Sequence, residues 1–166
     1  MNTCNGKKNQ RLECRNTNKV KIHFIFAQSE RMAIETNGIE LVTYGGNSTQ
    51  YFFSPKHRGN PTDEISVWII DHAQELAVFT TCFAQSWIDL FSGWGILQPF
   101  QVLGENLRNN KLIIAKFVVD QNQWHGYPAD VRYKPKDKPN PRILKSWYDD
   151  GLINKSTLSR IKQGQI

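Results

Sequence analysis

Cysteine is scarce in this chain, and long apolar runs are missing. The 166 residues include three cysteines and no CxxC pair, which argues against a disulfide framework and against a zinc ribbon. No apolar run reaches the roughly 18 residues that a membrane span needs, and the first twenty residues lack the apolar core of a signal peptide. We therefore expect a cytoplasmic protein with free thiols and no membrane association.

Metal and cofactor motifs are also lacking. The four histidines show no HxH, HExxH or Cys-His spacing, so we expect no metal site and no cofactor. The stretch TYGGNST lacks the GxxxxGK[ST] pattern of a phosphate-binding loop and is expected to form a turn. Asp63 and Glu64 are not followed by the lysine that a nuclease carboxylate pair needs, and we expect both to be solvated.

The net formal charge of +6 is distributed unevenly. Residues 1–22 hold six Lys or Arg against one Glu, and residues 121–166 hold nine against four Asp, a net +5 at each end. Residues 23–120 hold six basic and ten acidic residues, a net −4. Because two basic ends flank an acidic middle, a polyanion is expected to bind at the ends.

These patterns predict one domain preceded by a basic N-terminal segment. Residues 1–18 contain almost nothing apolar, so we expect a flexible N-terminal segment. Residues 19–166 are expected to form a single α+β domain, in which 121–166 is a basic strap plus a helical hairpin. The stretch KVKIHFIFA, from Lys19, alternates apolar and polar residues as a half-buried strand does.

A β-hairpin is the strongest local prediction. Asn37-Gly38 suits the two positive-φ positions of a type I′ turn, so residues 31–36 should pair with 39–44. GGNS should form a second turn, and TQYFFS, residues 49–54, a third strand.

The middle of the chain is harder to interpret. Residues 65–80 fit either a hairpin with a DHAQ turn or a helix, and their β-branched and aromatic residues favour the hairpin. Residues 83–91 are predicted to form one helix packed on a mostly antiparallel sheet. The continuous apolar run 111–120 is typical of a central strand.

Prolines and helix caps dominate the C-terminal part. Four prolines make 128–141 an extended strap. A first short helix should begin at Pro141 and end at Gly151, and a second should begin at Asn154 or Ser156 and end at Gly164. The motifs WHGYP, ILKSWYDDGLI and RIKQG resemble the ends of small bacterial proteins, a resemblance that implies no activity.

This C-terminal region is the candidate nucleic-acid site. Aromatic rings could stack on bases and cationic groups could contact phosphates. The alternative is that the aromatic residues anchor the tail to the sheet and the lysines keep it soluble. The candidate residues are Trp124, His125, Tyr127, Lys134, Lys136, Lys138, Arg142 and Lys145.

Two catalytic alternatives can be drawn from the sequence. An RNase-like mechanism would use His57 and His125, which both stand in turn-rich segments close to Lys or Arg. A cysteine hydrolase would use Cys82 as nucleophile, with His72 or His125 as base and Asp71 or Asn122 as the orienting group. Against it, Cys82 stands among large apolar residues, where a thiol is usually inert.

Taken together, these patterns predict a small non-enzymatic binding protein of prokaryotic or phage type that contacts nucleic acid through its basic terminal regions. One alternative is a protein-binding immunity or inhibitor module whose acidic middle meets a basic protein partner. The other alternative is an RNase-like enzyme or a cysteine hydrolase. The sequence does not indicate an oligomeric state.

Overall fold

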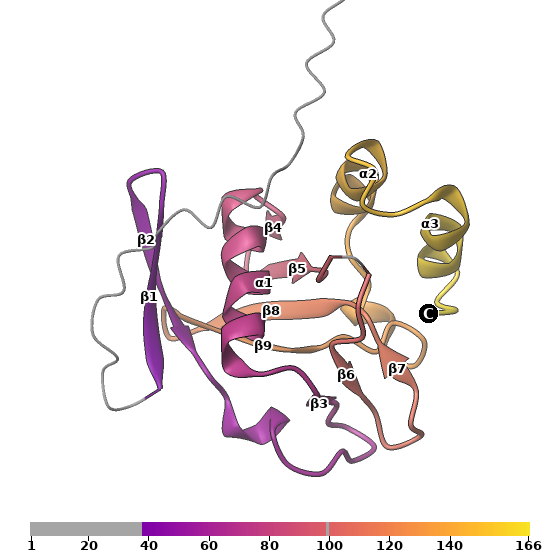
Figure 1. Ribbon diagram of the computed structural model, residues 1–166, viewed down its shortest axis with the longest axis horizontal. Coiled ribbons are helices and arrows are strands. Elements are labelled where there is room, and N and C mark those ends of the chain that lie inside the picture. Colours follow the sequence, from indigo (N-terminus) through magenta and orange to yellow (C-terminus); the bar gives the residue numbers. More distant parts are fainter. Residues whose placement is uncertain (1–37, 99) are drawn as a thin grey trace, which may run out of the picture.

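The computed structural model of the chain describes residues 38–98 and 100–166, and it has an α+β fold (Figure 1). Six strands, β1 (Ile39–Tyr44), β2 (Asn47–Phe52), β4 (Ile88–Asp89), β5 (Ser92–Gly95), β8 (Ala115–Asp120) and β9 (Gln123–Pro128), form the main sheet. Their order is β1-β2-β9-β8-β5-β4, and all pairs are antiparallel except β2–β9. A second sheet has the order β3-β6-β7 and consists of β3 (Val67–Trp68), β6 (Gly104–Glu105) and β7 (Lys111–Leu112).

The first hairpin is formed by β1 and β2, which pair from Ile39–Phe52 to Tyr44–Asn47. Gly45 and Gly46 connect them with φ angles of 57° and 81°, the two positive values that this kind of tight turn requires. The predicted GGNS turn is therefore confirmed, as is the strand after it. The predicted strand 31–36 lies outside the described residues, and so do the predicted flexible segment 1–18 and the predicted strand in KVKIHFIFA.

The predicted hairpin at 65–80 and the predicted helix at 83–91 are wrong. A single helix, α1 (His72–Ala84), replaces them. The Asp71 carboxylate accepts from the Gln74 backbone N–H at 2.7 Å, and the Gln74 side chain accepts from the Asp71 N–H at 3.2 Å. This reciprocal capping box starts the helix, while Val67–Trp68 before it form the strand β3. The chain after α1 forms β4 and β5.

Helix α1 packs directly on the backbone of the main sheet, and Figure 1 shows it lying across β5, β8 and β9. A Cβ at Gly95 would stand 2.6 Å from Val78 Cγ1, and one at Gly93 would stand 2.8 Å from Cys82 Sγ. Both approaches need glycine. Phe79 fills the centre, with its ring 4.5 Å from that of Tyr51 and 5.2 Å from that of Phe117.

The predicted central strand at 111–120 is divided between the two sheets. Its first part is β7, and its second part is β8, which lies between β5 and β9 inside the main sheet. The chain then turns at Gln121 and Asn122, both with positive φ, and returns as β9. The extended strap therefore begins only after Pro128, and it includes a short 3-10 turn, η2 (Pro135–Asp137).

Both predicted C-terminal helices are confirmed as α2 (Pro141–Asp149) and α3 (Lys155–Lys162). The Asn140 side chain caps α2 by accepting from the Ile143 N–H at 2.9 Å, and Asn154 caps α3 through the Thr157 N–H at 2.8 Å. Helix α2 buries Ile143, Leu144 and Trp147, and α3 buries Ile161. Among the described residues, no helix has the length and apolar character to cross a membrane.

A buried charged network ties α1 to the hairpin and to the loop after it. Glu75 is 1% exposed, and its carboxylate accepts from the Tyr51 hydroxyl at 2.6 Å and forms an ion pair with Arg58. The Arg58 guanidinium also donates to the Ile70 carbonyl. Burial raises the pKa of Glu75, while the hydrogen bond from Tyr51 and the charge of Arg58 oppose that shift. Removing the carboxylate would leave Arg58 without its counter-charge.

We expect Glu75→Ala to lower the free energy of unfolding by about 3–5 kcal/mol, because it breaks a buried ion pair and leaves one charge uncompensated. Urea denaturation followed by tryptophan fluorescence measures the change. Glu64→Ala is the matched control, since Glu64 is exposed and its loss should change stability by less than about 0.5 kcal/mol. Equal effects of the two substitutions would show that the network contributes nothing to stability.

Candidate nucleic-acid interface

The main sheet has one face toward α1 and one face away from it. Side chains alternate along a strand, and Phe117 of β8 packs against Phe79 of α1. Lys116 and Val118 must therefore lie on the far face. The register pairs Val118 with His125 and Lys116 with Tyr127, so these two residues of β9 share that face.

The strap covers half of the far face and is held there by Asp137. The buried Asp137 carboxylate accepts from the Tyr127 hydroxyl at 3.0 Å and pairs with Lys116 Nζ at 3.3 Å. The Trp94 indole N–H donates to the Asp137 carbonyl at 2.9 Å, and Lys116 also donates to the Lys136 carbonyl at 2.7 Å. Burial raises the pKa of Tyr127, and the neighbouring Asp137 raises it further. This half of the face is closed to ligands.

A loop that contains the 3-10 turn η1 (Pro55–His57) meets the strap over Tyr127. The His57 ring stacks on the Tyr127 ring at 5.3 Å, and its Nδ1 lies 2.8 Å from the Ser66 carbonyl oxygen. Lys134 of the strap donates to the Glu64 carbonyl. These contacts form a wall along the edge of the covered half.

The other half of the far face is open to solvent in the described part of the chain. We call it the open half-face. The Gln123 amide donates to the Gln50 side-chain oxygen at 3.3 Å, which joins β9 to β2 across this surface. The open half-face consists of residues that are all partly or fully exposed, namely Gln50, Phe52, Val118, Asp120, Gln123 and His125.

Positive charge borders the open half-face at the wall. Burial lowers the pKa of His125; Asp120 raises it and Lys56 lowers it further. Burial also lowers the pKa of His57, the hydrogen bond with the Ser66 carbonyl raises it, and the charges of Lys56, His125 and Lys134 lower it. Both histidines are therefore mainly neutral at pH 7. Lys56 is close enough to act on both, Lys134 acts on His57, and the acidic Asp120 acts on His125.

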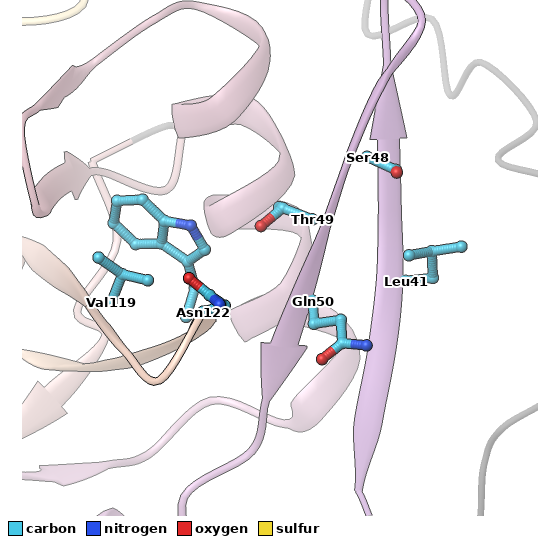
Figure 2. Close-up of a pocket in the computed structure, with 7 residues that line it drawn as sticks. Leu41, Ser48, Thr49, Gln50, Val119 and Asn122 are labelled. Atoms are coloured by element: carbon cyan, nitrogen blue, oxygen red, sulfur yellow. The ribbon is translucent and has the colours of Figure 1, made fainter.

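A pocket of about 490 Å³ lies between the β1–β2 hairpin and the β8–β9 turn. Figure 2 shows Thr49 and Gln50 of β2 across from Val119 and Asn122 at the turn between β8 and β9. Its lining residues are Leu41, Ser48, Thr49, Gln50, Val119, Asn122 and Trp124. Gln50 of the open half-face lines this pocket, whereas Val119 and Trp124 pair with each other on the side of the sheet that faces α1.

The structure separates the predicted nucleic-acid residues into two groups. His125 lies on the open half-face, whereas Lys134 and Lys136 lie on the strap that covers Lys116 and Tyr127. Their role in binding stays a prediction. The remaining cationic groups make contacts elsewhere: Lys138 donates to the Lys162 carbonyl, Arg142 to the Ser86 and Ile88 carbonyls, and Lys145 pairs with Asp149.

Two of the aromatic predictions need correction. The Trp124 ring is buried against Phe79, with ring centres 5.8 Å apart, so it cannot stack on a base. Tyr127 is engaged by Asp137 and His57. The sequence reasoning overlooked Gln50, Gln123 and Lys56. Alternation along the strand, counted back two residues from His125, would have predicted Gln123. No local sequence pattern indicates Gln50 or Lys56.

The thiol mechanism is not supported, because Cys82 is a core residue. It has no exposed surface, and its Sγ donates to the Trp87 carbonyl at 3.4 Å. Burial raises the pKa of this thiol to about 12, so the reactive thiolate is absent at neutral pH. Its proposed base His72 is exposed on α1 and packs against Phe53.

The two histidines of the RNase-like alternative do lie near one another, on either side of Tyr127. Such a mechanism needs one of them protonated to act as the acid, and burial lowers the pKa of both. No group of three or more His, Cys, Asp or Glu within 38–98 and 100–166 could hold a metal ion.

No family model, curated protein or solved structure matches the chain.

We expect Cys82 to react with a thiol reagent such as DTNB only when the protein is unfolded. The test uses a Cys4→Ser/Cys14→Ser variant, so that Cys82 is the sole thiol, and follows absorbance in native buffer and in denaturant at pH 7. Reaction in native buffer at the rate seen in denaturant would show that the thiol is accessible.

Proposed function

We propose that this chain is a non-enzymatic nucleic-acid-binding protein, and that single-stranded nucleic acid lies across the open half-face. The observation that carries the proposal is the combination of a partly exposed sheet surface bearing a histidine and two glutamines with a border of lysines. The proposal keeps the basic C-terminal region as the binding element and adds Lys56 from the η1 loop.

Each part of the surface offers one kind of contact. The ring of His125 and the half-exposed ring of Phe52 can stack on bases. The side-chain amides of Gln50 and Gln123 can exchange hydrogen bonds with the edges of unpaired bases. Lys56 and Lys136 are exposed and can contact phosphates. A single strand suits this arrangement, because its bases are free to lie on a sheet.

We expect a Lys56→Ala/Lys136→Ala variant to bind a labelled single-stranded oligonucleotide more weakly at low salt. Each lost phosphate contact should reduce the slope of log K against log salt by about 1. Fluorescence anisotropy over a salt series measures both quantities. The control is Lys155→Ala, which removes an exposed charge at the start of α3. The proposal fails if the wild type does not bind at low salt, or if all three slopes are equal.

We expect the affinity to rise as the pH falls from 7 toward 5. Burial lowers the pKa of His125, so its positive charge forms only below the ordinary histidine range near 6.5, and a protonated ring attracts phosphate. His57 titrates in the same direction. His125→Gln should flatten much of this pH dependence, and the control His72→Gln on α1 should not. A profile unchanged in His125→Gln would remove His125 from the interface.

A further inference from the structure

Two large apolar side chains are displayed at the tip of the β4–β5 hairpin. Leu90 is 84% exposed and Phe91 is 71% exposed, the two highest values among the large hydrophobic residues described. Both stand in the two-residue turn between Asp89 and Ser92, which pair with each other. We call Leu90 and Phe91 the apolar tip.

The apolar tip is unfavourable for an isolated chain. Leu90 has a φ of 49°, a left-handed conformation that costs a bulky residue energy. The other tight turns of the main sheet use Gly45-Gly46 and Gln121-Asn122 at their positive-φ positions. The tip is also held in place, since the Phe91 carbonyl accepts from the Val119 N–H at 3.2 Å. A rigid, strained display of apolar surface is typical of a binding anchor.

A pocket of about 500 Å³ lies next to the tip, between the β1–β2 hairpin and the end of α1. Ile88 lines it and precedes Leu90 by two residues, so their Cα atoms are at most about 7 Å apart. Its lining residues are Tyr44, Gly45, Asn47, Phe83, Ala84, Ser86 and Ile88. One surface therefore carries both an apolar projection and a partly apolar pocket.

We propose that this surface is the interface of a two-fold symmetric dimer, in which the apolar tip of each copy enters the pocket of the other. A two-fold interface uses the same patch on both copies, and a projection beside a matching pocket meets that condition. Charge also matches. Asp89 is exposed beside the tip and accepts from the Asn140 side-chain amide at 3.0 Å, and Arg142 donates to the carbonyls of Ser86 and Ile88, two residues that line the pocket. The interface uses no residue of the open half-face.

Sedimentation velocity over a concentration series tests this dimer. The wild type should shift from the 19.2 kDa chain to a species of twice that mass as the concentration rises. Leu90→Asn/Phe91→Ser should raise the dissociation constant at least about thirty-fold, because interface anchors typically contribute that much. Ala84→Trp, which fills the pocket, should have the same effect. Asparagine tolerates the left-handed conformation at position 90, so the tip variant should melt no lower than the wild type.

Two controls distinguish this specific dimer from nonspecific hydrophobic association. Leu107→Ser removes an apolar residue that is 49% exposed elsewhere on the surface and should leave the dimer intact. A mixture of the tip variant and the pocket variant restores one tip and one pocket, so it should associate more tightly than either variant alone. A wild type that stays monomeric, dimers unaffected by both variants, or a mixture no tighter than its components would overturn the proposal.

Discussion

The close contact between α1 and the main sheet is the constraint on which the rest of the structure depends. Glycines at 93 and 95 remove the side chains that would hold the helix away, so Val78 and Cys82 rest on the backbone of β5. Phe79 then fills the space among Tyr51, Phe117 and Trp124. One helix therefore suffices to close this face of the sheet. The far face is covered in part by the strap, which contains only the short 3-10 turn η2.

The strap covers that far face with polar chemistry. Its proline content leaves few backbone donors, so side chains make the attachment, and the buried Asp137 collects Tyr127 and Lys116 at one point. Such a buried pair needs hydrogen bonds to offset the cost of desolvation; the Tyr127 hydroxyl donates one to the carboxylate, and the Lys136 carbonyl accepts one from Lys116. The attachment is strong locally but narrow. The part of the far face that the strap does not reach stays exposed to solvent and forms the open half-face.

Elements with their own local signals could be predicted from the sequence. Capping residues and apolar spacing placed both C-terminal helices, and Gly45-Gly46 placed the first described turn. Helix α1 was missed because the β-branched residues before it dominated the interpretation, although Asp71 and Gln74 already formed a capping-box pattern. The β4–β5 turn could not be predicted, since Leu90 and Phe91 are not turn residues. The candidate site could be predicted only in part. The sequence analysis placed Trp124 and His125 of β9 on one surface, whereas alternation along the strand directs Trp124 to the core and His125 to solvent.

The distribution of charge in the folded chain follows from the same alternation. The described residues hold 14 basic and 12 acidic side chains, so their net charge of +2 alone would not attract a polyanion strongly. Position matters more. Lys116 is neutralised beneath the strap by Asp137, while Lys56 and Lys136 stay exposed. Glu75, Asp130 and Asp137 are buried, as is Lys116, so burial removes three of the twelve negative charges and one of the fourteen positive charges from the surface. The charge left on the exposed surface is therefore more positive than the count of +2 implies.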